Sequence, residues 1–147
     1  MKDFVHLHVH SQYSILDGQA SIPKMVDKAI ADGMKGMALT DHGNMMGVKD
    51  FFNYTEKVIS KGKKALKELT AKLELIEAGT YTPTGEEEGL TLEQIKEKLL
   101  PQIQKQERIA NFKRLLGCEM YVARRGMLLK EGKQDTSGWH LVVIAKN

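Results

Sequence analysis

Apolar and polar residues alternate strictly over residues 4–11, close to the start of the chain. Successive side chains of an extended strand point to opposite faces, so Val5, Leu7 and Val9 would share one face. Histidines occupy the other face, at every second position from 6 to 10. The pattern predicts a strand with one face for a core and one row of imidazoles, which either faces water at a sheet edge or holds a metal ion.

Two segments of helical spacing and one short apolar run follow this strand. Residues 21–33 have apolar positions three and four apart, between a serine that suits an N-cap and a glycine that suits a stop. The run at 37–40 predicts a buried strand, parallel to the first through a right-handed crossover. A second helix is expected over residues 48–59, with a break at Gly62.

Residues 63–110 have a different pattern, with two runs of leucine and isoleucine at alternating three- and four-residue spacing. A glycine- and threonine-rich loop separates the runs, and Thr91 with Gln94 matches a capping box at the start of the second. Pro101 should kink or end that second helix. We expect a helical hairpin; its many lysines could approach nucleic acid or acidic partners, but interleaved glutamates favour a solvated face.

Strand character returns at residues 115–122 and again at 139–145. The last run is very apolar, which predicts a central strand. Glu119 is a lone carboxylate in the first of these runs, so it is either a partnered buried group or an outward-facing side chain. The sequence stops at Asn147 directly after the last strand, which suggests a part of a longer protein.

Composition limits the class of protein and its environment but names no reaction. The chain has 147 residues, a net charge of +3 and a single cysteine, Cys118. These values fit one globular domain from a reducing, cytoplasmic environment, without an internal disulfide. The charge is too small to indicate nucleic acid by itself, and we expect no signal peptide and no membrane association. The sequence has no phosphate-binding loop of the GxxxxGKS type and no nucleophile elbow.

The histidines carry the chemical signal. All five lie within or beside an expected strand, and three acidic residues accompany them: His6, His8, His10, His42 and His140, with Asp17, Asp41 and Glu119. Carboxyl ends of parallel strands hold ligands in α/β folds, which favours a shared site for His8, His10 and His42. Mixed imidazole and carboxylate donors suit Zn, Mn or Fe better than Ca. Two or three such ions clamp a phosphoryl group and activate water.

Simpler interpretations stay open for several of these residues. Asp17 precedes a glycine in a turn and could be only a turn residue. Asp41 and His42 could form a capped loop with an orienting hydrogen bond. His140 stands at the start of its strand, where the carboxyl-end rule predicts no ligand. Ser11 and one of the arginines at 124 and 125 could help to hold phosphate oxygens.

Four segments of the sequence resemble, in order, motifs of the polymerase-and-histidinol-phosphatase (PHP) family. The segments run from His6 through Ser11 to Leu16-Asp17-Gly18, from Leu39 to Asn44 with Met46-Gly47, from Gly117 to Val122, and from His140-Leu141 to Ala145-Lys146-Asn147. The residues of these segments are most similar to those of PHP domains at the N-terminus of bacterial DNA polymerase III alpha subunits. The resemblance covers nearly the whole chain apart from the expected hairpin.

The resemblance implies an α/β fold, a distorted (β/α)7 TIM-like barrel. Residues 1–147 would be its N-terminal part, with residues 63–110 as a helical-hairpin insertion and further ligands beyond Asn147. It implies up to three divalent ions. The metal ligands by motif match are His8, His10, Asp17, His42, Glu119 and His140. Glu119 and Asp41 would be catalytic, with Asp41 and His6 orienting or tuning the ligands.

The function implied by the resemblance is metal-dependent phosphoester hydrolysis, which in a replicative DNA polymerase can be 3′–5′ exonuclease proofreading. Water would attack, with Glu119 between the ions. The partners would be a DNA 3′ end and other polymerase subunits. Two alternatives are a structural module that braces the polymerase without catalysis, and a stand-alone phosphatase of the histidinol phosphatase kind.

Overall fold

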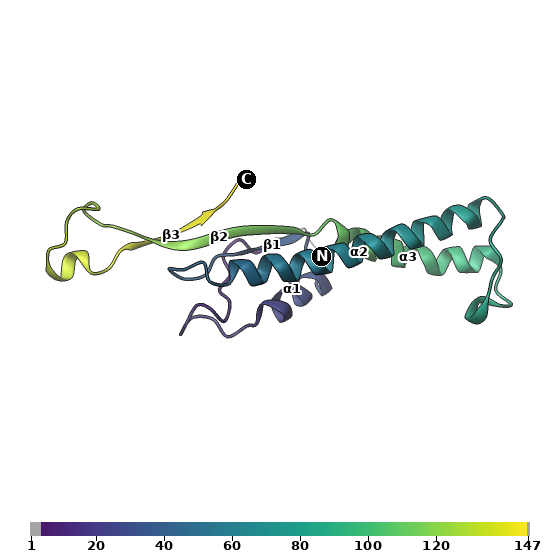
Figure 1. Cartoon of the computed structure of the whole chain (residues 1–147), viewed down its shortest axis with the longest axis horizontal. Coiled ribbons are helices and arrows are strands. Elements are labelled where there is room, and N and C mark those ends of the chain that lie inside the picture. Colours follow the sequence, from purple (N-terminus) through teal and green to yellow (C-terminus); the bar gives the residue numbers. More distant parts are fainter. Residues whose placement is uncertain (1–3, 147) are drawn as a thin grey trace. The chain divides into compact units, whose positions relative to one another are not determined.

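The computed structural model describes residues 4–146 and divides into two compact units (Figure 1). The first, which we name the body, combines Met1–Thr55 with Lys113–Asn147. The second, which we name the hairpin, is Glu56–Phe112. None of the helices in residues 4–146 combines the length and hydropathy of a transmembrane segment.

The body is a mixed α/β unit with a small open sheet. Its regular elements are α1 (Ile22–Ala31), β1 (Gly36–Leu39), the start of α2 (Val48–Glu77), β2 (Lys113–Val122), a 3-10 turn η2 (Gly132–Asp135) and β3 (Trp139–Ile144). Strand β1 is fully buried and pairs in parallel with the first part of β2. Helix α1 contacts β1 and buries an apolar stripe of Ile22, Val26 and Ala29. The α/β class expected from the sequence is therefore confirmed.

Strand β3 differs from its expected central position. The sheet order is β1-β2-β3 and β3 pairs antiparallel with the last part of β2, so β3 is an edge strand within residues 4–146. Trp139, Leu141 and Val143 are exposed on one face of it. Apolar composition alone cannot separate a central strand from an edge strand, because composition does not say which neighbours are present.

The alternating segment at residues 4–11 is not a regular strand. It runs beside β1, where Ala38 and Thr40 donate their backbone N–H groups to the carbonyls of His6 (2.8 Å) and Val9 (2.9 Å). The amide of Val9 donates in turn to the side-chain oxygen of Thr40 at 2.9 Å. A hydroxyl therefore replaces a ladder carbonyl, which explains why pairing stays limited to an isolated bridge between His6 and Met37.

The hairpin consists of the rest of α2, a 3-10 turn η1 (Gly85–Glu87) and α3 (Leu92–Ala110). Its core is aliphatic, with four buried residues and a partly buried surround. The buried four are Ile76, Ile95, Leu99 and Ile103, with Leu66, Leu69 and Leu73 packed against them. The capping box at the start of α3 is confirmed, because the Thr91 side chain accepts from the Gln94 amide and the Gln94 side chain accepts from the Thr91 amide.

Two expected interruptions of these helices do not occur. Helix α2 continues through Gly62, and a Cβ there would lie only 2.6 Å from Cγ2 of Ile109. This glycine is therefore a point of close helix approach rather than a break. Helix α3 continues through Pro101, which is exposed, so packing of the buried residues on both sides of it outweighs the lost backbone hydrogen bond.

Candidate metal centre

The end of β1 and the middle of β2 place the candidate residues beside one another. Beyond β1 the chain stays paired with β2: the amide of Glu119 donates to the Asp41 carbonyl at 3.1 Å, and the amide of Gly43 donates to the Glu119 carbonyl at 2.8 Å. His42 and Glu119 therefore form a parallel bridge. Residues 77 positions apart in sequence meet at the carboxyl end of β1, where ligands gather in such folds.

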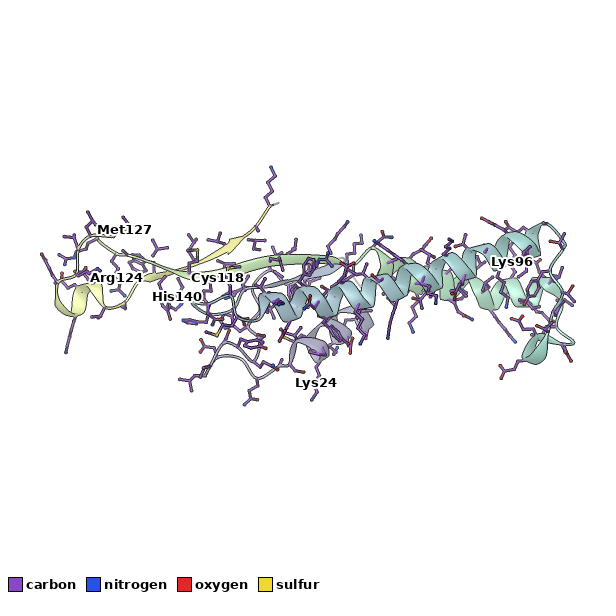
Figure 2. The ribbon with its side chains drawn as sticks, viewed as in Figure 1. Lys24, Lys96, Cys118, Arg124, Met127 and His140 are labelled. Carbon is purple, nitrogen blue, oxygen red and sulfur yellow. The ribbon has the colours of Figure 1, made fainter. Side chains whose placement is uncertain are left out.

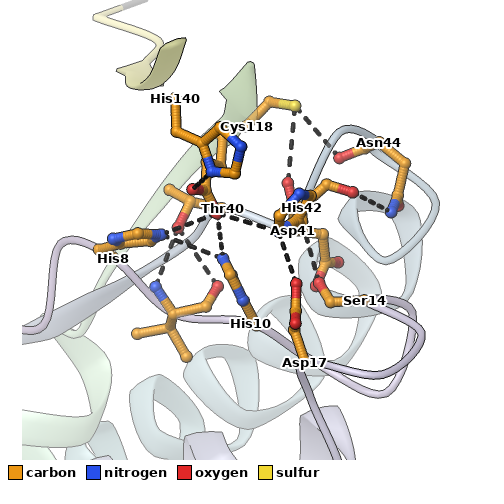
Figure 3. Close-up of polar contacts among 12 residues, drawn as sticks. His8, His10, Ser14, Asp17, Thr40, Asp41, His42, Asn44, Cys118 and His140 are labelled. Carbon is orange, nitrogen blue, oxygen red and sulfur yellow. Dashed lines mark hydrogen bonds and ion pairs between the residues drawn. The ribbon is translucent and has the colours of Figure 1, made fainter. Parts of the chain in front are cut away.

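Four imidazoles lie close together, those of His8, His10, His42 and His140 (Figure 3), and the carboxylate of Glu119 lies among them. Its Oε2 lies 2.6 Å from Nε2 of His10 and 3.2 Å from Nε2 of His8. Its Oε1 lies 2.8 Å from Nδ1 of His140. Nδ1 of His42 lies 3.6 Å from Oε2. Glu119 is only 6% exposed, so the buried interpretation of this residue is the one the structure supports.

Electrostatics keep this buried carboxylate charged. Burial raises the pKa of the Glu119 carboxyl, but hydrogen bonds from His8, His140 and His10 and the charge of His42 outweigh burial and lower the pKa to about 2. Glu119 is therefore an anion at neutral pH. A fixed anion among ring nitrogens is a favourable setting for a cation.

Three overlapping groups of donor atoms surround this centre, and within each group the atoms lie within 4.8 Å of one another. The groups are His8, His10 and Glu119; His10, Asp17 and His42; and His42, Glu119 and His140. In the first group the Nε2 atoms of His8 and His10 lie 3.0 Å apart. At most one proton fits between two facing ring nitrogens, whereas a borderline divalent ion accepts a lone pair from each, so these residues fit a metal ion.

Asp17 reaches the cluster from a tight turn. The amides of Asp17 and Gly18 donate to the Ser14 carbonyl at 3.0 and 2.8 Å, and Leu16 takes a positive φ of 76°. This turn brings Oδ2 of Asp17 to 2.6 Å from Nδ1 of His42. The structure thus brings together all six residues that motif resemblance assigns as ligands.

Asp41 lies outside the three donor groups. Its carboxylate is buried and accepts from the Ser11 amide (2.7 Å), the Ser11 hydroxyl (2.9 Å) and the Ser14 hydroxyl (2.7 Å). The Ser14 hydroxyl also accepts from the His42 amide at 2.9 Å. Gly47 permits this network, because a Cβ at that position would lie 2.5 Å from Oδ2 of Asp41. An orienting role for Asp41 is consistent with these contacts and stays a prediction.

Ser11 and Ser14 correct the sequence interpretation. The expectation that Ser11 holds phosphate oxygens is wrong, because its side chain is fully buried and its hydroxyl donates to Asp41. Ser14 was missed. The only signal for it was its place in the first motif, since spacing alone does not reveal that two serines turn inward toward one carboxylate.

The structure leaves His6 out of the donor groups and brings Tyr121, which the sequence analysis missed, into contact with the cluster. His6 contacts Phe4 edge to face, with ring centroids 4.8 Å apart, and belongs to none of the three donor groups. The hydroxyl of Tyr121 contacts Nε2 of His42, and its ring lies 4.9 Å from that of His140. The period of β2 could have revealed Tyr121, which shares a strand face with Glu119 two residues earlier.

The loop between β2 and β3 carries the basic residues considered for phosphate (Figure 2). Arg125 pairs with Asp135 at 2.5 Å and Glu131 at 3.2 Å, so its guanidinium is engaged within the loop. Arg124 lies over the Trp139 ring, 5.0 Å from its centroid.

A cavity of about 560 Å³ adjoins the cluster, and His6, His8 and His10 are among the residues that line it.

Comparison with known proteins places these motifs in a family. The sequence pattern of the PHP domain matches residues 6–147. Similar proteins include the DNA polymerase III alpha subunits of Borreliella burgdorferi (30% identical) and Treponema pallidum (32%), each over 98% of this chain and 8% of the relative. The alpha subunit of Aquifex aeolicus is 49% identical over 35% of the chain. The chain thus spans about 8% of the length of the first two relatives.

Proposed function

The chain belongs to the PHP domain family, and on that premise we propose that it is the N-terminal part of a metal-dependent phosphoesterase domain of a bacterial replicative DNA polymerase. The proposed substrate is the 3′ end of DNA, cleaved by water as in proofreading. In this proposal the open sheet is one side of a distorted (β/α)7 barrel, and residues 63–110 are a helical insertion into it. The same proposal implies a cytoplasmic location and a complex with other polymerase subunits.

One observation carries the proposal: four histidines lie within 3.6 Å of one ionised glutamate, and Asp17 contacts one of them, although the six residues come from four separate segments. A purely structural polar cluster needs no such set, because buried imidazoles are satisfied by one partner each. Convergence of imidazoles and carboxylates without a lysine or arginine among them is instead typical of a metal site. Within residues 4–146, no lysine or arginine side chain is recorded in contact with Glu119.

The donor arithmetic limits how many ions these six residues can hold. A neutral imidazole offers one lone pair at a time, so His10 and His42 each serve one ion, although each belongs to two of the three groups. A carboxylate offers two oxygens and can serve two ions. The six residues therefore supply two three-ligand sets that share Glu119, with Asp17 as an added ligand. A third ion would need ligands from elsewhere.

The residues of the chain have separate tasks in this proposal. His8 and His10 with Glu119 would hold one ion, and His42 and His140 with Glu119 would hold another. Divalent ions bound there would polarise a phosphoryl oxygen and activate water for attack. Asp41 would orient the site, because it fixes Ser11 and Ser14, and Ser14 in turn fixes the amide of His42.

The metal content of the purified chain tests the site. Elemental analysis after dialysis should find Zn, Mn or Fe bound to the wild-type chain, and His8→Ala should reduce the amount by about half, because one of two sets is lost. His6→Ala is the matched control: it lies on the same segment but outside the donor groups, and it should leave the metal content unchanged. A wild-type chain free of metal, or equal losses in both variants, would sink the proposal.

Release of nucleotides from 3′-labelled DNA tests the reaction. We expect Mn-dependent release by the chain, or by the longer polymerase that contains it, and its loss in Glu119→Gln with the control His6→Ala fully active. If metal binds but Glu119→Gln leaves release unchanged, the module is structural and braces its polymerase. Activity confined to small phosphomonoesters would instead favour the phosphatase alternative.

A further inference from the structure

The charges of the hairpin are separated into two halves, although the unit has ten basic and ten acidic residues. The half formed by residues 56–68 and 103–112 has seven basic and three acidic residues, a net charge of +4. The half formed by residues 69–102 has three basic and seven acidic residues, a net charge of −4. The contact between Gly62 and Ile109 and the cluster of Ile76 with Ile95 show that each half is contiguous in space.

The positive charge is concentrated on one face of α2. The five lysines there share exposure and lie within one short stretch: Lys57, Lys61, Lys63, Lys64 and Lys67. At about 100° per residue they fall within an arc of about 160°, along about 15 Å of helix. No acidic residue lies between the first and the last of them. The apolar positions Ile59, Leu66 and Leu69 fall on the opposite side, toward the hairpin core.

Ion pairs in the hairpin lie elsewhere. Lys72 pairs with Glu87 at 2.6 Å, and Lys96, on α3 (Figure 2), pairs with Glu77 at 3.0 Å. Among the described residues, none of the five clustered lysines has such a partner. Glutamates are interleaved with lysines in the sequence, yet these ion pairs lie in the negative half, and on this face acidic residues occur only at the two ends of the lysine row, as Glu56 and Glu68.

We propose that this lysine face of α2 is a binding surface for the phosphate backbone of duplex DNA. Duplex DNA presents about one negative charge per 1.7 Å of its axis, so about nine charges would face the 15 Å of the lysine row. Lysines act as point charges on phosphate, without base recognition, so the binding is independent of sequence. The choice of DNA rests on the proposed function; the charge argument does not.

A second copy of the chain is the competing occupant, through its own negative half. Two of the acidic residues there, Glu77 and Glu87, already pair with lysines of the same unit. The remaining acidic groups are spread over two helices and the 79–91 loop rather than along one row. A continuous polyanion matches the lysine row better than this dispersed set.

Fluorescence anisotropy of a short labelled DNA duplex, titrated with the full chain over a range of salt concentrations, tests the proposal. The triple variant Lys57→Gln, Lys61→Gln, Lys64→Gln should bind more weakly, and its slope of log affinity against log salt should be shallower by about 2.7. The matched control is Lys24→Gln, Lys49→Gln, Lys146→Gln, three exposed lysines of the body. It loses the same net charge and should keep the wild-type slope within about 0.5.

Equal slopes for wild type and the lysine-face variant would overturn the proposal, and so would equal losses in both triple variants, which indicate net charge alone. Self-association that the variant abolishes, with unchanged duplex binding, would make a second copy the occupant. Circular dichroism and the triple Lys→Arg variant, which should restore binding, exclude loss of folding. The lysine-face variant should keep the metal content of the wild-type chain, so a failed metal site and a failed lysine face give different results.

Discussion

The body and the hairpin are held together by different kinds of interior. In the hairpin the buried side chains of the core cluster are aliphatic, and their contacts join residues of two consecutive helices. In the body, Ser11, Ser14, Thr40, Asp41 and Glu119 are all buried polar residues. Most of their side-chain hydrogen bonds join residues 21 to 111 positions apart. The body also buries an apolar layer where α1 packs on β1, so what distinguishes it from the hairpin is its additional buried polar groups, which position charged side chains.

This difference explains where each unit is vulnerable. An aliphatic core loses stability when a smaller side chain leaves a cavity, but it has no polar groups to leave unpaired. A buried polar network fails when one member is lost, because its partners then remain desolvated without hydrogen bonds. The two units should therefore respond in opposite ways to cavity-forming and to polar substitutions.

The largest expected effect is in the hairpin. Ile95→Ala removes three carbon atoms from a side chain that is 2% exposed, and the loss of burial together with the cavity should cost about 2–5 kcal/mol. Urea unfolding followed by circular dichroism measures this free energy. Leu100→Ala, on the exposed side of α3, is the control and should cost less than about 1 kcal/mol. Equal costs at the two positions would mean that the aliphatic cluster is not the core of this unit.

A slightly smaller effect is expected from the polar network of the body. Asp41→Ala leaves the Ser11 amide and the hydroxyls of Ser11 and Ser14 without their acceptor, which should cost about 2–4 kcal/mol in thermal unfolding. Asp27→Ala is the matched control, because Asp27 also accepts a hydrogen bond, from Tyr54 at 2.8 Å, but is exposed. If both variants unfold alike, burial does not set the strength of this network.

The smallest expected effect is the loss of folding stability in acid, which should be larger for the body than for the hairpin. The pKa of Glu119 is lowered from 4.5 to about 2, so its contribution is present above pH 4.5 and is lost as the pH falls toward 2. A shift of this size corresponds to about 3 kcal/mol at most. Hydrogen bonds from Lys72 and Tyr81 also lower the pKa of Glu87, but that side chain is 28% exposed, against 7% for Glu119, so solvent screens it more.

The measurement for this comparison is unfolding of the metal-free chain from pH 7 to pH 2. The stability difference between wild type and Glu119→Gln should shrink through this range, whereas the difference between wild type and Glu87→Gln should stay small throughout. A Glu119 curve as flat as the Glu87 curve would show that the histidines do not hold the carboxylate ionised.

Local patterns predicted the hairpin well. Its capping box and the spacing of Leu99 and Ile103 are properties of one helix, and each can be recognised within a dozen residues. The continuity of α2 at Gly62 could not be predicted, because the reason for this glycine lies on α3, about fifty residues later. The separation of lysines from glutamates also needed the fold, since sequence shows interleaving but not faces.

The candidate site was predictable in its residue types and less so in its geometry. The spacing of His8 and His10 and the place of His42 after a buried strand indicated a shared site. Local pattern left Glu119 open and only the motif resemblance assigned it to the site; the pairing of β2 with the chain beyond β1 gives the physical reason. The engagement of Ser11 with Asp41, and the edge position of β3, depend on neighbours that no local pattern reveals.

Strand β2 is paired along both edges where Glu119 lies, and this has a consequence for the proposed metal site. The backbone of Glu119 is bonded to Asp41 and Gly43 along one edge and lies opposite Val142 along the other. The side chains of His8 and His140 are about half exposed, 50% and 47%, whereas that of Glu119 is 7% exposed. In the proposed metal site these outer imidazoles would therefore be the donors most accessible from solvent, and they stand in front of a carboxylate whose position the strand pairing already fixes.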